Sequence, residues 1–338
     1  MELIDNINQK YKIVSIIGMA KNAGKTVTLN KIIEDAYYED INLGITSTGR
    51  DGEREDVVTS TEKPAIYVYE ESIIATTTGS IEQGDATVEI LEVTNYRSSM
   101  GNIVLARVVY GGYIEIAGAQ TANEMKVLSQ KMLNYGAELV LIDGSINRIA
   151  VADPTVTEAT ILATGAVLSR NMDKVIKETL HQKTILSLDE VGIDIKKIIE
   201  KNIDKISVID KEKRVKSVDL KTSLNSGKII ADNIDEDSRY VYIPGCFVTK
   251  TLKDLTESTK YYKNIKIIVR DGTKIFISPI DWFKFKKKGI EINVLNRVNI
   301  AAITLNPYSP SGYYFDRDNF KDKMDKYIKD VPVYDVMM

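Results

Sequence analysis

The sequence predicts an α/β fold with a mainly parallel central sheet, because apolar runs of strand length alternate with segments of helical periodicity. The first run, residues 11–17, leads through a glycine-bearing loop into residues 27–36, whose apolar positions follow a helical period. Further apolar strands are predicted at residues 137–143 and 159–165, and the second of these precedes a helix at residues 171–180. This alternation indicates a three-layer, Rossmann-like arrangement with helices on both faces of the sheet.

The loop after the first strand reads Gly18-Met-Ala-Lys-Asn-Ala-Gly-Lys-Thr26 and has a physical reason to hold a nucleoside triphosphate. Main-chain N–H groups of such a loop, with the positive N-terminus of the next helix, surround a β-phosphate. Lys25 then reaches the β and γ oxygens and stabilises developing charge as a catalytic residue, while Thr26 ligates magnesium. The alternative is a glycine-rich helix entry without a ligand. The predicted binding residues of this P-loop NTPase core are Gly18, Lys21, Asn22, Ala23, Gly24, Lys25, Thr26 and Val27.

An acidic loop at residues 50–56 follows the predicted second strand, residues 42–49. Ligands of open α/β sheets lie beyond the carboxyl ends of the strands, so this loop is placed to face the magnesium ion and the γ-phosphate. We predict Asp51 as a metal ligand, with Asp51 and Glu53 as catalytic carboxylates; Asp56 is a further candidate. A solvated turn whose acids are neutralised by neighbouring arginines is the alternative.

The strand at residues 137–143 ends in an aspartate more than a hundred residues beyond the loop. Magnesium keeps most of its water and accepts one or two protein carboxylates, so Asp143 is predicted to hold the metal opposite Thr26. The alternative is a surface aspartate that caps the strand.

Three segments are predicted along the chain: a nucleotide-binding core at 1–184, an inserted or accessory α/β region at 185–295 and a completion of the core at 296–338. Within the first, residues 65–117 are strand-rich, with strands predicted at residues 89–93 and 102–109. Thr121 with Glu124 forms a capping box for a helix through Tyr135. The accessory region is enriched in Lys, Asp, Ile and Ser, and its pattern alone does not reveal its function.

Composition narrows the classes of function that the chain can serve. The chain has 338 residues, 45 basic and 48 acidic side chains and a net charge of -3, so its overall charge gives no support for nucleic acid or an anionic membrane as partner. The basic, aromatic stretch at residues 281–289 is interpreted as a solvated turn. A single cysteine, Cys246, excludes an internal disulfide, and a single histidine, His181, argues against a triad mechanism. We expect a soluble, cytoplasmic protein.

Five residues separate Gly18 from Gly24, one more than in the usual motif. This spacing, followed by Gly-Lys-Thr-Val, resembles dethiobiotin synthetase and the MinD and ParA branch of P-loop proteins. The resemblance implies a possible homodimer in which Lys21 reaches the nucleotide of the partner, although a solvated lysine is the alternative. It also implies that Asn306 and Pro307 hold the adenine edge; an Asx turn before Pro307 is the rival interpretation.

Four segments together are similar to the ATPase subunit of the lysine 5,6-aminomutase reactivase, namely residues 18–26, 46–53, 63–68 and 306–313. The resemblance implies a MutS-like partner subunit and an adenosylcobalamin- and pyridoxal-phosphate-dependent aminomutase as the target. ATP turnover would then exchange damaged cobalamin for intact cofactor. Two other functions stay open: an ATP-dependent small-molecule ligase similar to dethiobiotin synthetase, and a nucleotide-binding switch without turnover.

Overall fold

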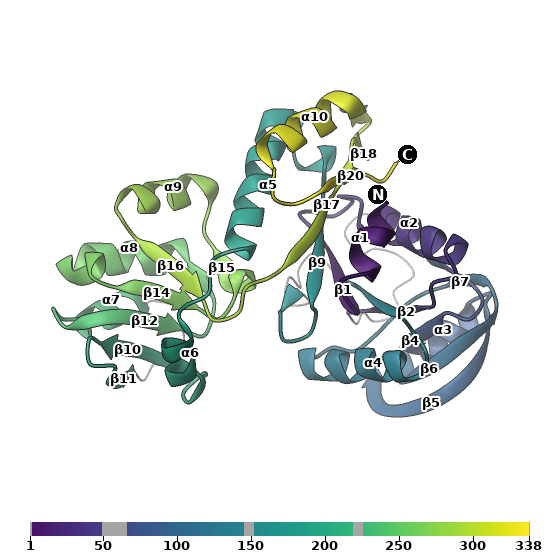
Figure 1. Ribbon diagram of the computed structural model, residues 1–338, viewed down its shortest axis with the longest axis horizontal. Helices are drawn as coiled ribbons and strands as arrows, with labels where there is room; N and C mark the ends of the chain where they lie inside the picture. Colours follow the sequence, from purple (N-terminus) through teal and green to yellow (C-terminus); the bar gives the residue numbers. More distant parts are fainter. Residues whose placement is uncertain (1, 49–65, 145–151, 219–225, 338) are drawn as a thin grey trace. The chain divides into compact units, whose positions relative to one another are not determined.

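The computed structural model describes residues 2–48, 66–144, 152–218 and 226–337. The chain forms two compact units (Figure 1): unit 1 comprises residues 1–180 and 299–338, and unit 2 comprises residues 181–298. Unit 2 is therefore an insertion between two parts of unit 1. The boundaries predicted from composition, at 184/185 and 295/296, differ from these by three or four residues.

Unit 1 is built on a nine-stranded sheet with the order β20-β17-β9-β1-β8-β2-β4-β6-β5. Neighbours from β20 to β4 run parallel, and β6 and β5 add an antiparallel edge. The predicted α/β fold with a mainly parallel sheet is therefore confirmed. The strands are β1 (Ile13–Gly18), β2 (Leu43–Ser47), β4 (Ile73–Thr77), β5 (Thr87–Ser98), β6 (Gly101–Tyr110), β8 (Leu139–Asp143), β9 (Ala159–Gly165), β17 (Ile300–Asn306) and β20 (Val333–Asp335).

Both faces of this sheet are buried. Successive side chains of a strand point to opposite faces, so each strand contributes to two cores. Leu141 of β8 packs into one core, with α1 (Leu3–Asn8) and α2 (Lys25–Tyr38). Its neighbours Val140 and Ile142 pack into the other, against α4 (Ala122–Asn134). The remaining elements of this part of the chain are β3 (Ile66–Val68), α3 (Thr78–Gln83), β7 (Gly112–Ile114), η2 (Ala166–Leu168), α5 (Met172–Leu186), β18 (Tyr308–Ser309), β19 (Tyr313–Tyr314) and α10 (Arg317–Tyr327).

The strand-rich segment forms the antiparallel edge of the sheet. The predicted strand at residues 89–93 is too short, because β5 runs for 12 residues beside β6. The capping box at the start of α4 is confirmed: Thr121 accepts a hydrogen bond from the Glu124 N–H, and the Glu124 side chain accepts one from the Thr121 N–H. Sequence pattern thus located the helix start better than the extent of the edge strand.

Unit 2 has a five-stranded sheet with the order β11-β10-β12-β14-β16. Its strands β12, β14 and β16 are parallel, and β10 and β11 run antiparallel at one side. Helix α6 packs on one face of the sheet, and helices α7, α8 and α9 pack on the other. The bounds are α6 (Ile193–Glu200), β10 (Ile206–Asp210), β11 (Val215–Val218), α7 (Ser226–Asp232), β12 (Ser238–Ile243), β13 (Phe247–Val248), α8 (Thr249–Ser258), η3 (Lys260–Lys263), β14 (Lys266–Val269), η4 (Gly272–Lys274), β15 (Ile275–Phe276), α9 (Pro279–Lys287) and β16 (Glu291–Val294).

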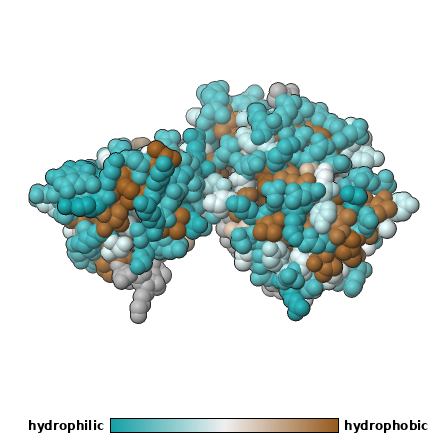
Figure 2. Space-filling model, turned by 60° about the horizontal axis from the view of Figure 1, so that its bottom comes forward, coloured by the Kyte–Doolittle hydropathy of each residue, from teal (hydrophilic) through white to brown (hydrophobic). Residues whose placement is uncertain are grey.

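The prediction of a solvated turn at residues 281–289 is wrong, because Pro279–Lys287 forms helix α9. Ser278 caps this helix by accepting from the Asp281 N–H, and Pro279 occupies its first turn. Trp282 and Phe285 lie on the buried side, whereas Ile280 and Phe283 are exposed. Figure 2 shows apolar side chains among the hydrophilic ones on the surface of both units. Among the described residues, no helix is both long and apolar enough to cross a membrane.

Candidate functional site

The predicted phosphate loop connects the end of β1 to the start of α2, at the carboxyl edge of the central sheet. The Met19 N–H donates to the Ala163 carbonyl of β9 at 2.9 Å, which ties the start of the loop to the neighbouring strand. Asn22 and Gly24 have left-handed φ values of 61° and 101°. Gly24 is the N-cap of α2 and gives it no side-chain cap, so main-chain groups and the helix dipole define this helix start.

Lys25 folds back over the loop. A Cβ atom at Gly18 would lie 2.8 Å from the Lys25 Cγ and 3.0 Å from its Cδ, so only glycine leaves room for this arrangement. Burial lowers the pKa of Lys25, and the Asp143 carboxylate opposes that shift. The structure thus holds Lys25 in a partly desolvated place beside Gly18, where an anion gains most from its charge.

Asp143 is brought to the loop by the pairing of neighbouring parallel strands. It lies opposite Ile16 of β1 and opposite Ser47 of β2, so β8 carries it between the two strands. Its Oδ1 atom is buried without a hydrogen-bond partner among the described residues. Burial raises the pKa of this carboxyl, and the Lys25 ammonium works in the opposite direction. A buried carboxylate oxygen without a partner fits an absent cation or its water shell.

Thr26 is the second residue of α2 and is partly exposed. In the described part of the chain, no group of three or more His, Cys, Asp or Glu side chains is arranged to hold a metal ion. Magnesium does not require such a group, since it binds through one or two carboxylates and keeps several waters. Thr26 and Asp143 therefore fit magnesium, and their roles as ligands stay predictions.

Asn306 lies at the end of β17, beside Gly165 at the end of β9. Its Nδ2 donates to the Asn22 carbonyl at 3.3 Å, and its Oδ1 accepts from the Tyr308 N–H at 3.0 Å. The second bond is the Asx turn before Pro307 that was the rival interpretation. Pro307 is buried, and its carbonyl accepts from the Phe315 N–H at 2.9 Å. Asn306 thus positions the loop, and contact with a base stays a prediction.

The other predicted loop residues differ in exposure. Ala23 is buried, Asn22 is exposed, and Lys21 and Val27 are partly exposed. The acidic residues Asp51, Glu53 and Asp56 lie outside the described residues. The chain enters their segment from Thr48, whose N–H donates to the Asp143 carbonyl at 3.0 Å.

Two buried pairs of hydroxyl groups join the elements that carry the loop, and the sequence did not reveal them. Thr28 of α2 and Thr304 of β17 are hydrogen-bonded at 2.8 Å, which ties the helix after the loop to the strand that carries Asn306. Ser15 and Thr160 are joined at 2.9 Å between β1 and β9. The sign of such a pair in a sequence is a Ser or Thr at a core-facing position, because a buried hydroxyl group requires a hydrogen-bond partner.

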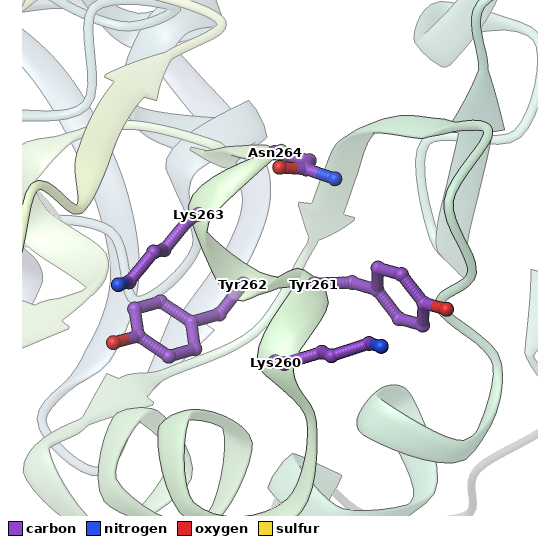
Figure 3. A pocket seen from close by; sticks show the side chains of 5 residues that line it. All are labelled: Lys260, Tyr261, Tyr262, Lys263 and Asn264. Carbon is purple, nitrogen blue, oxygen red and sulfur yellow. The ribbon is translucent and has the colours of Figure 1, made fainter.

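A separate hollow of about 480 Å³ lies in unit 2 and is lined by residues of η3 and Asn264 (Figure 3). Tyr261 and Tyr262 point in opposite directions, and Lys260 and Lys263 lie over their rings. These lysines are solvated neighbours of aromatic rings, and no buried polar group converges there among the lining residues. The loop at the edge of the central sheet is the stronger candidate site.

Comparisons of this chain with known family models, curated proteins and solved structures find no match.

Proposed function

We propose that this chain is a Mg·ATP-dependent P-loop NTPase that reactivates an adenosylcobalamin-dependent aminomutase. The nucleotide-binding part rests on the position of Lys25. This residue starts α2 and folds over Gly18, with the Asp143 carboxylate nearby. An anionic ligand at this helix start would pair with the lysine and with the main-chain N–H groups of the first helical turn. The single cysteine is in keeping with a cytoplasmic setting.

In this proposal each residue of the site acts on the polyphosphate. Lys25 binds the β and γ oxygens and stabilises the charge that develops between them. Thr26 and Asp143 orient the magnesium ion, which supplies Lewis-acid stabilisation of the phosphate charge when bound. A carboxylate among Asp51, Glu53 and Asp56 orients the attacking water. Asn306 adjoins the loop through Asn22, and in this proposal it also contacts the base.

The reactivase part rests on the resemblance of four segments of the sequence, residues 18–26, 46–53, 63–68 and 306–313. In that role, loss of the γ-phosphate contacts relaxes the segments that follow Thr48 and Gly144. Both residues are tied to the site, because Thr48 donates to the Asp143 carbonyl and the Gly144 N–H donates to the Ile16 carbonyl. The conformational change is then transmitted to the MutS-like subunit and the mutase.

Turnover measurements with Mg·ATP test the proposal and separate it from the alternatives. The protein is assayed alone, with an aminomutase and its MutS-like partner, and with candidate carboxylate or amine metabolites. Turnover that depends on the proteins supports the reactivase, turnover that depends on a metabolite supports a ligase, and binding without turnover supports a switch. Lys25→Ala should abolish all three, whereas the exposed Lys177→Ala serves as the matched control. Unchanged nucleotide affinity in Lys25→Ala would refute the phosphate assignment.

A further inference from the structure

A second candidate site lies on the flank of α2, in a surface hollow of about 400 Å³. Tyr67, Tyr69 and Tyr113 form its aromatic side, and Val27, Lys31 and Glu34 of α2 line the opposite side. Val27 directly follows Thr26, so the hollow and the candidate phosphate loop share one helix. The nucleotide site uses none of the three tyrosines.

The tyrosines are held in fixed orientations by the strand pairing. Ile66 and Val68 of β3 point into the core, which leaves Tyr67 outside, directly opposite Tyr113 of β7. The Tyr67 ring is nearly perpendicular to that of Tyr113 at 5.2 Å, and it meets Tyr69 edge-to-face at 4.8 Å. Tyr67 and Tyr113 remain 36% and 54% exposed. Aromatic surface of Tyr67 and Tyr113 is therefore presented to solvent.

Tyr69 is also fixed from the side of α2. Its ring stacks on Tyr37 with centroids 4.2 Å apart and planes 17° apart. Tyr37 lies near the end of α2, one turn beyond Glu34. The helix and the β3–β7 pair therefore hold the aromatic side together as one surface.

The charge on this surface is negative. The Lys31 ammonium forms an ion pair with the Asp35 carboxylate at 2.8 Å, whereas the Glu34 side chain is exposed at the hollow. The Glu34 carboxylate contributes, after burial, to a raised pKa of Tyr69, which places its charge close to that ring. Unit 1 as a whole carries 31 acidic and 21 basic residues, compared with 17 and 24 in unit 2. This imbalance attracts cations to unit 1.

We infer that this hollow binds a cationic side chain, an arginine or lysine presented by a partner protein. Tyrosine faces attract a cation through their ring quadrupole, and Glu34 supplies the opposite charge beside them. A guanidinium group suits the site well, because it stacks on aromatic rings and donates to a carboxylate at the same time. The inference goes beyond nucleotide turnover and holds whether or not the chain hydrolyses ATP.

Fluorescence anisotropy of dye-labelled peptides with the full-length protein tests this inference. The probe is a short Gly/Ser peptide with three arginines, and its matched control has citrulline, the neutral isostere, at the same positions. At low salt we expect the arginine peptide to bind at least tenfold more tightly than the citrulline peptide. Glu34→Gln and Tyr67→Ala should each weaken binding at least fivefold. Tyr67→Phe should retain it, because the ring face is kept.

Tyr110→Ala is the control variant, because Tyr110 is 65% exposed and does not line the hollow. It should bind the arginine peptide like the unaltered protein. Equal binding of the citrulline peptide would overturn the inference, since the hollow would then select for apolar contact. Binding that is unchanged in both Glu34→Gln and Tyr67→Ala would overturn it too, because attraction would then come from acidic surface elsewhere. Glu34→Gln alters only an exposed side chain, which keeps the test valid if Tyr67→Ala misfolds.

Discussion

Gly24 packs against Asn306, so that a Cβ atom at Gly24 would lie 2.8 Å from the Cβ of Asn306. The contact joins the last residue of the candidate phosphate loop to the end of β17, although the two are far apart in the sequence. Gly24 also has a φ of 101°, which side-chain-bearing residues rarely adopt. Two separate constraints therefore require glycine at this position.

Gly24→Ala should destabilise unit 1 and weaken nucleotide binding. Gly136→Ala is the matched control, because Gly136 has a φ of 109° with nothing within 4 Å of its Cβ position. The control should lose about 1 kcal/mol through backbone strain alone, and Gly24→Ala should lose at least ~1 kcal/mol more through the clash. Chemical unfolding followed by circular dichroism measures both. Equal losses in the two variants would show that Asn306 does not restrict this position.

Asn306→Ala should separate a base contact from a structural role. Removing the amide loses the bonds to Asn22 and Tyr308, so some loosening of the loop is expected for every ligand. If Asn306 also meets the base, ATP affinity should fall about tenfold, roughly 1.4 kcal/mol, while the affinity for inorganic tripolyphosphate falls much less. Calorimetric titration with both ligands measures the difference. Parallel losses would leave Asn306 with its positioning role alone.

Asp143→Asn should weaken the magnesium dependence of nucleotide binding. The amide keeps the size of the side chain but removes the charge that is proposed to face the metal. We expect the affinity for Mg·ATP to fall at least tenfold and the affinity for metal-free ATP to change little or rise, because a negative charge near the phosphates is lost. Titrations with and without EDTA measure both values. A variant that binds Mg·ATP normally would contradict the metal assignment.

The same substitution should stabilise the nucleotide-free protein at neutral pH. Burial raises the folded-state pKa of Asp143 above its ordinary 3.8, so the folded state binds this proton more tightly than the unfolded state. Stability is then lost as the pH rises from about 3.8 through the raised folded value. Asp143→Asn removes the charge and with it the cost of ionising a buried carboxyl.

Hydrogen exchange of the β1 and β8 amides, measured at acidic and neutral pH, checks this expectation. Protection in Asp143→Asn should exceed that of the unaltered protein, and the gap should widen as the pH rises. A gap that narrows with rising pH would mean that Lys25 already compensates the charge of Asp143 in full.

The sequence predicted the parts of this fold that local rules determine. The order of strand, loop and helix around Gly18 and Lys25, and the capping box at Thr121, follow from residue types a few positions apart. The contact between Gly24 and Asn306 does not, because it depends on β17 returning beside β9 after the whole of unit 2. Periodicity also gave no sign that residues 279–287 form a helix, since Ile280 and Phe283 lie on its exposed side while Trp282 and Phe285 are buried.

The candidate site was also predicted only in part. Asp143 was found because an apolar strand ended in a carboxylate, and strand pairing places it opposite Ile16. The hydroxyl pair of Thr28 and Thr304 was not found, because only the three-dimensional packing reveals that two buried threonines meet. Which interpretation of Asn306 applies was left open by the sequence, and its bond with the Tyr308 N–H shows that the Asx turn is formed.

The structure of the protein with a non-hydrolysable ATP analogue and magnesium tests the central claim most directly. The account predicts the β-phosphate within hydrogen-bond distance of the main-chain N–H groups between Gly18 and Thr26, with the Lys25 ammonium over the β and γ oxygens. A nucleotide bound elsewhere, or a loop that stays filled by its own side chains at saturating analogue, would contradict it.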